Sequence, residues 1–176
     1  MWSNVGGKKL PGFAGRHRRH LRRLFKAGLR PIPDVVAVLD GLDSRGCPAC
    51  VASSGTPERI EHALSLVGLY ERFQPNLFST VAVARGKPAP DLFLYAAAQM
   101  GAMPQHCVVI EDSIPGVSAA VAAGMTAIGC TGGSHCRPEL SARLTAQGAV
   151  QVTHTMSALL PILLDLPGRA APTPSR

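Results

Sequence analysis

The stretch VVIEDSIPG, residues 108–116, decides the fold class of this chain. The apolar residues Val108–Ile110 predict a buried strand, and the alanine-rich run that follows Gly116 predicts a helix. Glu111 and Asp112 stand between the two elements. Adjacent carboxylates at the end of a buried strand repel each other and resist the loss of water. The sequence therefore predicts that these two acids are held there to bind a ligand.

Similar strand and helix patterns alternate along the rest of the chain. We expect strands at residues 49–52, 78–83, 106–110, 126–130 and 150–154, and helices that begin near residues 34, 56, 90, 114, 138 and 156. Thr56 is the expected N-cap of the second of these helices, and Gly101 should follow the end of the third. This alternation is typical of an α/β fold, in which helices cover both faces of a parallel sheet.

Composition agrees with one folded α/β domain. The chain has 176 residues, of which 46% are hydrophobic and 16% charged, so most of it should fold. No apolar run reaches the roughly 18 residues that a membrane span needs, and no secretory signal is evident. The five cysteines are an odd number without regular spacing, which argues against a disulfide framework. We therefore expect a cytoplasmic protein that has no membrane partner.

The positive charge is concentrated at the N-terminus. Residues 1–30 carry nine Lys or Arg and no acid, whereas residues 31–176 carry nine Lys or Arg and eleven acids. The expected organisation is a basic N-terminal tail or remnant at 1–28, a core domain at 29–165 and a disordered C-terminal tail at 166–176. The basic segment suits nucleic acid or an acidic surface, and it also resembles a transit segment. We favour a third interpretation, in which it is the remnant of a helix from another domain.

Polar side chains follow three neighbouring parts of the predicted sheet. Ser53 offers a hydroxyl donor, Lys87 offers a fixed positive charge, and Glu111 and Asp112 offer the hard oxygen ligands that suit Mg²⁺. Ligands of open parallel sheets bind beyond the carboxyl ends of the strands. A donor, a cation and metal-binding carboxylates at that edge predict a site for a phosphoryl group.

Three stretches resemble the motifs of the haloacid dehalogenase superfamily, in the family's order. VASSG resembles its second motif, RGKPAPDLF its third, and VVIEDSIPGVSAAVAAGM its fourth, in the Glu-Asp version typical of the branch of β-phosphoglucomutase and phosphoglycolate phosphatase. The resemblance runs from about Leu29 to Leu164. It implies a Rossmann-like fold and Mg²⁺-dependent hydrolysis or transfer of phosphate on small phosphorylated metabolites such as sugar phosphates.

The resemblance also implies a role for each matching residue. Ser53, helped by the amide of Ser54, would bind phosphoryl oxygens, and Lys87 would neutralise the phosphate. Asp112 would ligate Mg²⁺, while Glu111 would either hold a metal-bound water or orient Lys87. Ser53 and Lys87 are thus the expected catalytic residues that this chain retains. Gly86 would allow close approach of the backbone, and His135, in the loop GGSHC, is a possible substrate contact.

The family's first motif is missing from the sequence. That motif is an apolar strand ending in Asp-x-Asp-Gly-Thr, and its first Asp is the nucleophile. The nearest imitation is VAVLDGLDS, but Val38 stands where the nucleophile would be, and the apolar spacing there predicts a helix over 34–45. Without the first-motif strand, which is central in the family, its two neighbours must pair with each other or leave a gap. Most of the family's cap domain is missing as well.

The function expected from the sequence is therefore that of a phosphatase or phosphomutase lineage with little or no turnover. One alternative is a non-catalytic remnant that binds phosphate, metal or a protein, and another is a nucleic-acid binder that uses the basic segment. Glu111 and Asp112 alone could simply cap the next helix. Cys47 and Cys50 have redox spacing, but they precede a strand instead of opening a helix. Neither the substrate nor the oligomeric state follows from the sequence, and no spacing supports a zinc site.

Overall fold

The computed structural model describes residues 29–133, 136 and 139–166. The expected basic segment 1–28 and the tail from residue 167 lie outside this range. In chain order the elements are α2 (Val35–Asp43), β1 (Val51–Ser53), α3 (Pro57–Leu66), α4 (Tyr70–Phe73), β2 (Leu77–Ser79), η1 (Thr80–Ala82), α5 (Asp91–Gln99), η2 (Pro104–His106), β3 (Val108–Glu111), α6 (Ile114–Ala122), β4 (Thr126–Cys130), α7 (Leu140–Ala146), β5 (Gln151–Thr153) and α8 (Leu159–Asp165).

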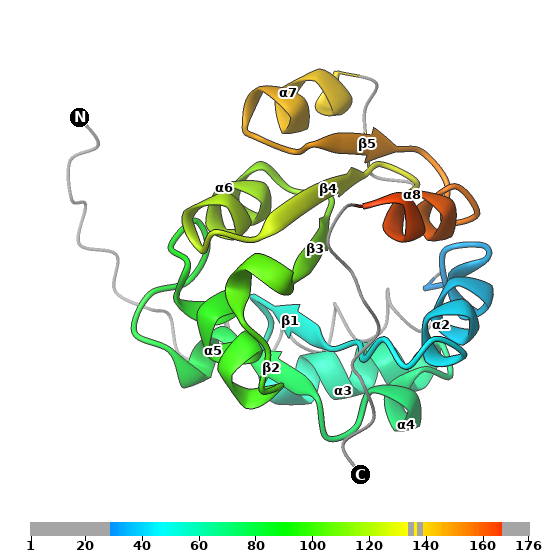
Figure 1. The fold of residues 1–176 in the computed structure, drawn as a ribbon. Coiled ribbons are helices and arrows are strands. Elements are labelled where there is room, and N and C mark those ends of the chain that lie inside the picture. The colour runs from blue at the N-terminus through cyan, green and yellow to red at the C-terminus, as the bar shows by residue number, and fades with distance from the viewer. Residues whose placement is uncertain (1–28, 134–135, 137–138, 167–176) are drawn as a thin grey trace, which may run out of the picture.

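The strands form two parallel sheets, and helices pack on their faces (Figure 1). One sheet has the order β1–β2 and the other the order β3–β4–β5. All three pairings between neighbouring strands are parallel. The α/β architecture predicted from the sequence is therefore confirmed. Among the described residues no strand pairs with both β1 and β3, and these two strands do not pair with each other.

Alternate residues of β3 and β4 point to opposite faces of their sheet, as the strand period requires. Val109 and Ala127 belong to a cluster with side chains of α5, α6 and α7. Ile128 belongs to a second cluster, with side chains of α2 and α8, and Val108 and Ile110 pack against it. Both faces of this sheet are therefore covered by helices.

Two helices span both sheets. On one face, Val38 of α2 packs in the cluster with Ile128, while its neighbour Leu39 packs in a cluster that includes Val51 of β1. On the other face, Phe93 of α5 packs with Val109, while Leu92 packs in a cluster with β2. Because α2 and α5 contact both sheets, they hold β1 and β3 near each other although the strands share no ladder.

Helix α2 confirms the prediction that VAVLDGLDS is helical. Its residues Asp40 and Asp43 form exposed ion pairs with Arg72 at 2.6 and 2.5 Å. Asp40 is thereby engaged on the outer side of α2, and it does not line the cavity at the strand ends. The nearest sequence imitation of the first motif is therefore a surface helix held by an arginine.

The expected strand at 78–83 is wrong in its second half. The strand β2 ends at Ser79, because the Ser79 hydroxyl accepts a hydrogen bond from the amide of Val81 at 3.2 Å. This bond turns the chain into the short helix η1. Similarly, β3 begins at Val108 and not at His106, since residues 104–106 form the 3-10 turn η2. The remaining expected elements are present within a few residues of their predicted bounds.

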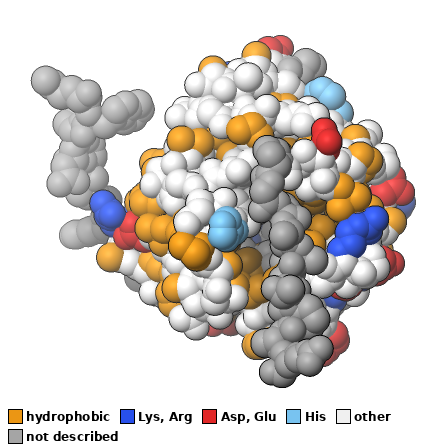
Figure 2. All heavy atoms as spheres, viewed as in Figure 1, with side chains coloured by type: hydrophobic (Ala, Val, Ile, Leu, Met, Phe, Trp, Pro, Cys, Tyr) orange, Lys and Arg blue, Asp and Glu red, His pale blue; other side chains and the backbone are white. Residues whose placement is uncertain are grey.

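The surface view shows hydrophobic side chains scattered among polar ones and few lysines or arginines (Figure 2). This agrees with the near balance of charges beyond residue 30. Within the described part of the chain, no helix is both long and apolar enough to cross a lipid bilayer.

Candidate phosphate and metal site

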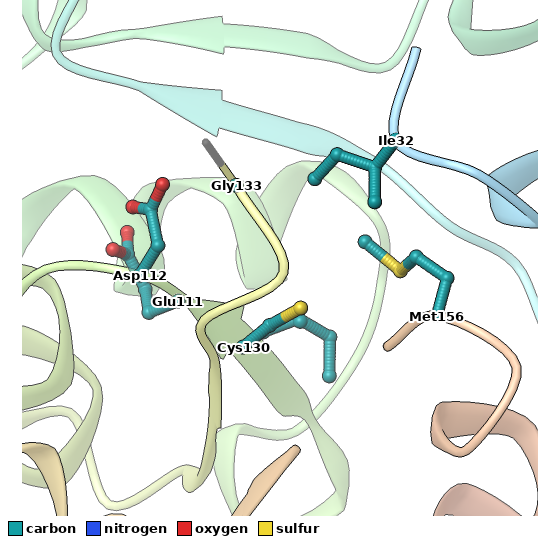
Figure 3. A pocket seen from close by; sticks show the side chains of 7 residues that line it. Ile32, Glu111, Asp112, Cys130, Gly133 and Met156 are labelled. Carbon is teal, nitrogen blue, oxygen red and sulfur yellow. The ribbon is translucent and has the colours of Figure 1, made fainter. Parts of the chain in front are cut away.

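The carboxyl ends of β1 and β3 carry predicted polar residues, and β4 ends beside them. Ser53 is the last residue of β1, Glu111 is the last of β3, and Cys130 is the last of β4. Asp112 follows Glu111 directly, and Figure 3 shows the carboxylates of these two acids on the same side of the loop that follows β4.

Lys87 joins the ends of the two sheets. Its ammonium group donates a hydrogen bond to the carbonyl oxygen of Ala52 in β1 at 3.2 Å, and another to Oε1 of Glu111 in β3. The side chains of Lys87 and Glu111 are only 10% and 9% exposed. The ammonium also lies 4.6 Å from the centre of the Phe93 ring, a cation–π contact. The structure therefore brings Lys87 and Glu111 together, which is one of the two arrangements that the resemblance left open for Glu111.

Ser113 fixes the other oxygen of Glu111 and caps the next helix. Its hydroxyl donates to Oε2 of Glu111 at 2.8 Å and accepts from the amide of Gly116 at 3.1 Å. A Cβ atom at Gly116 would lie about 2.0 Å from the Glu111 carboxyl carbon. Glycine is needed here because the buried carboxylate occupies the space above the first turn of α6. The cap of this helix is Ser113, so helix capping by Glu111 is not observed.

The loop after β1 is shaped by hydroxyl groups of the neighbouring strand. Oγ of Ser53 accepts a hydrogen bond from the amide of Gly55 at 3.1 Å, which leaves its hydroxyl proton able to point toward a ligand. Ser79 donates to the carbonyl of Gly55 at 2.6 Å, and Thr80 donates to the carbonyl of Ser54 at 3.3 Å. Sequence reasoning missed Ser79 and Thr80, although both lie within the expected strand at 78–83.

A cavity of about 220 Å³ opens beside the two acids. Its described lining is Ile32, Ile110, Glu111, Asp112, Cys130, Gly133 and Met156. Figure 3 shows Asp112 and Glu111 on one side and Ile32 and Met156 on the other. The far wall is apolar, so among the described residues only Asp112 and Glu111 bring carboxylates to this cavity. Ile32 and Met156 carried no sequence signal, whereas Cys130 could have been found as the last residue of an expected strand.

Asp112 fits one position of a magnesium site, and Glu111 is otherwise engaged. Asp112 is exposed to solvent, and Glu111 accepts hydrogen bonds from Lys87 and Ser113. Mg²⁺ usually keeps several waters and binds one or two carboxylates together with substrate phosphate. The described residues contain no cluster of three or more potential metal-binding side chains. They thus offer part of the ligand set that Mg²⁺ requires.

Two cysteine environments bear on the redox alternative. Burial, and secondly the nearby Cys107, raise the pKa of the Cys50 thiol. Burial, followed by the charge of Asp112, also raises the pKa of Cys136. A redox-active thiol needs a lowered pKa, so the environment of Cys50 disfavours a redox function for Cys47 and Cys50.

The remaining predicted site residues stay predictions. His135 lies outside the described residues. At Gly86 a Cβ atom would meet Thr80 at an ordinary 3.5 Å, so packing within the chain does not demand glycine there. The closeness of Gly86 to a bound ligand is therefore still an expectation.

A model of the family described as haloacid dehalogenase-like hydrolase matches residues 6–124. The match reaches upstream of Leu29, where we expected the resemblance to begin. The 6-phosphogluconate phosphatase of Escherichia coli is 28% identical over 129 residues, which is 73% of this chain and 57% of that protein. The chain thus spans a little more than half of this relative.

Solved structures show the same relationship. A haloacid dehalogenase-like protein from Agrobacterium tumefaciens superposes with a TM-score of 0.80 at 34% identity, covering 89% of this chain and 70% of the other. A β-phosphoglucomutase-type protein from Thermotoga maritima superposes with a TM-score of 0.77 at 25% identity, covering 91% and 72%. The name of the second neighbour matches the branch that the Glu-Asp version of the fourth motif indicates.

Proposed function

Because this chain belongs to the haloacid dehalogenase-like hydrolase family, we propose that it is the phosphate- and magnesium-binding part of a phosphatase of small phosphorylated sugar metabolites. The observation that carries the proposal is the position of Lys87, which is hydrogen-bonded to the strand of Ser53 and to Glu111. The name of the Escherichia coli relative supports a phosphorylated sugar acid as one substrate of this class.

In this proposal each residue has one task. The hydroxyl of Ser53 and the amide of Ser54 donate to the phosphoryl oxygens, and the ammonium of Lys87 offsets their charge. Glu111 holds the ammonium in place, since its two oxygens are bound by Lys87 and Ser113. Asp112 supplies a carboxylate to Mg²⁺, which would stabilise the negative charge of the phosphoryl group.

The described lining of the cavity offers no further carboxylate that could act as the nucleophile. Phosphoryl transfer through a covalent intermediate needs a carboxylate nucleophile, and the remaining described lining of the cavity is Ile32, Ile110, Cys130, Gly133 and Met156. None of these residues is a carboxylate. We therefore expect the chain alone to bind phosphate in the presence of Mg²⁺ and to hydrolyse phosphate esters slowly or not at all.

Titration calorimetry with inorganic phosphate, with and without Mg²⁺, tests binding. We expect Mg²⁺ to strengthen binding, Asp112→Asn to remove this enhancement and Ser53→Ala to weaken binding at least several-fold. Asp165→Asn and Ser118→Ala are matched controls, because they change an exposed aspartate of α8 and a serine bonded within α6. Absence of phosphate binding by the folded parent chain would overturn the proposal.

Hydrolysis of a generic aryl phosphate tests the expected lack of turnover. Clear Mg²⁺-dependent hydrolysis that disappears in Asp112→Asn would show that the chain has a nucleophile of its own. The nucleic-acid alternative depends on residues outside the described range. It predicts binding that falls steeply with salt and is lost when residues 1–28 are removed.

A further inference from the structure

Two hydroxyl groups hold the loop that follows β1. The parallel register of β1 and β2 pairs Ser53 with Ser79, so the chain beyond Ser79 runs beside the chain beyond Ser53. Ser79 donates to the carbonyl oxygen of Gly55 at 2.6 Å, and Thr80 donates to the carbonyl oxygen of Ser54 at 3.3 Å. Two successive carbonyl groups of this loop are therefore bound by two successive side chains of the neighbouring segment.

The bond from Thr80 acts on the peptide group that also binds Ser53. The carbonyl of Ser54 and the amide of Gly55 belong to one peptide group, which is planar. That amide donates to Oγ of Ser53 at 3.1 Å. A chain of hydrogen bonds therefore runs from the Thr80 hydroxyl through one peptide group to the Ser53 hydroxyl. Hydrogen bonds in such a chain polarise and strengthen one another.

Ser79 fixes the next peptide group from a buried position. The residue is only 6% exposed, its hydroxyl proton is donated to Gly55, and its oxygen accepts from the amide of Val81 at 3.2 Å. A hydroxyl group has a single proton to donate, and Thr80 likewise donates its proton to Ser54. Both hydroxyl groups are thus engaged with the loop and have no proton left to donate to a phosphoryl oxygen.

Thr80 also lies beside the loop of Lys87. A Cβ atom placed on Gly86, the residue before Lys87, would lie 3.5 Å from the methyl carbon of Thr80. Lys87 in turn donates to the carbonyl of Ala52, the residue before Ser53, at 3.2 Å. The hydroxyl group of Thr80 therefore faces one part of the proposed phosphate site, and its methyl group faces the other.

We propose that Ser79 and Thr80 are positioning residues, which orient the Ser53 hydroxyl toward a phosphoryl oxygen by binding the two carbonyl groups of its loop. This inference rests on the proposed function, in which Ser53 donates to phosphate. Because the Gly55 amide occupies one lone pair of the Ser53 oxygen, the hydroxyl proton of Ser53 points away from that amide. Without the Thr80 hydroxyl, the peptide group would be free to tilt, and the Ser53 hydroxyl would lose its fixed direction.

Thr80→Val and Thr80→Ser separate the hydroxyl group of this residue from its methyl group. Valine keeps the branched shape and loses the hydroxyl, whereas serine keeps the hydroxyl and loses the methyl group beside Gly86. In titration calorimetry of the full chain with inorganic phosphate and Mg²⁺, Thr80→Val should weaken binding about fivefold, as expected for one net hydrogen bond. Thr80→Ser should stay within about twofold of the parent chain. Equal weakening by both variants, or none by Thr80→Val, would overturn the proposal.

A double-variant cycle shows whether Thr80 acts through Ser53. In the Ser53→Ala background the Gly55 amide has no hydroxyl to orient, so adding Thr80→Val should change phosphate affinity by less than about twofold. A purely structural role would produce the same loss in both backgrounds and would contradict the proposal. Ser79→Ala should weaken phosphate binding at least as much as Thr80→Val, because its bond to the loop is shorter and more buried. No weakening by Ser79→Ala would overturn its part in the proposal.

The Gly55 amide reports on the loop without phosphate. In a proton–nitrogen correlation NMR spectrum, we expect the Gly55 amide proton to move upfield and to exchange faster with solvent in Thr80→Val, because its bond to Ser53 weakens. In Thr80→Ser it should keep its position. An unchanged Gly55 signal in Thr80→Val would overturn the positioning role. Lack of phosphate binding by the parent chain would instead overturn the proposed function and leave this measurement valid.

The unmodified chain provides a measurement that does not depend on how the variants fold. A buried hydroxyl proton that is donated to a carbonyl at 2.6 Å exchanges slowly with solvent. The Ser79 hydroxyl should therefore give a resolved proton signal in the NMR spectrum of the full chain labelled at serine. Absence of that signal would show that Ser79 does not hold the loop in solution.

Discussion

The strands β1 and β4 both carry apolar residues, but their surroundings differ. Val51 and Ala52 of β1 are half-buried, whereas Ala127 and Ile128 of β4 are 1% and 0% exposed. The difference comes from their neighbours, because β4 pairs on both sides and β1 pairs with β2 alone. Between β1 and β4, the greater burial thus accompanies pairing on both sides.

The strongest test of how the sheets are joined is Lys87→Met. This change leaves Glu111 buried without its cation, and breaking a buried ion pair by removing one partner costs about 3–5 kcal/mol. We expect that loss in the free energy of unfolding, measured by urea denaturation. The double variant Lys87→Met with Glu111→Gln should recover much of it, because no unpaired charge remains. A loss below about 1 kcal/mol for the single variant would show that the pair does not hold the sheets together.

A pair of alanine substitutions tests the difference in burial directly. Ile128→Ala should lower the free energy of unfolding by about 2–5 kcal/mol, since it opens a cavity in the cluster with α2 and α8. Val51→Ala should cost about 1 kcal/mol, because its side chain is already half-exposed. Equal losses in urea denaturation would mean that β1 is as well packed in solution as β4.

Gly116→Ala tests how closely Glu111 is held at the end of β3. The added methyl group would overlap the Glu111 carboxylate, so the variant should lose about 1–3 kcal/mol of stability. Gly86→Ala is the matched control on the loop of Lys87, where the new methyl group meets Thr80 at an ordinary distance. We expect the control to stay within about 1 kcal/mol of the parent chain. Thermal denaturation of the two variants side by side measures the contrast.

The smallest expected effect concerns the ion pair between Arg85 and Asp91, beside the sheet formed by β1 and β2. Hydrogen bonds from Arg85, at 2.8 and 3.1 Å, lower the pKa of Asp91 below its ordinary value of 3.8. A lowered pKa in the folded state contributes stability above pH 3.8, and this is lost as the pH falls through the folded-state pKa.

Unfolding of the parent chain and of Arg85→Gln, measured at pH 5 and near pH 2, checks this contribution. The stability difference between the two proteins should be small at pH 5, because the Arg85 side chain is largely exposed and solvent screens the ion pair. It should vanish near pH 2. A difference that persists at low pH would show that Arg85 acts through packing instead of charge.

Much of the fold followed from patterns in the sequence. Periodicity and capping residues are local signals. They predicted the helix at 35–43, the start of α3 at Pro57 and the five strands. The bounds of β2 were not predictable. Its end depends on the hydrogen bonds of the Ser79 hydroxyl to Val81 and to Gly55, and Gly55 is distant in the sequence.

The candidate site was predictable as a set of residues but not as a set of contacts. Ser53, Lys87, Glu111 and Asp112 could be selected because motif order places them at strand ends. The sequence left open whether Glu111 holds a metal-bound water or Lys87, and whether it caps α6. The structure shows Glu111 paired with Lys87 and the cap provided by Ser113. Such choices depend on which groups meet in three dimensions.

The sequence by itself determined the parallel α/β architecture, the family and the lack of a first-motif aspartate, since these are properties of local patterns and of their order. Only the tertiary structure decided how the chain accommodates the missing strand. The strands β1 and β3 do not pair with each other. Instead, α2 and α5 pack against both sheets and Lys87 spans their ends. Helix packing and one buried ion pair therefore join the two sheets where no strand ladder does.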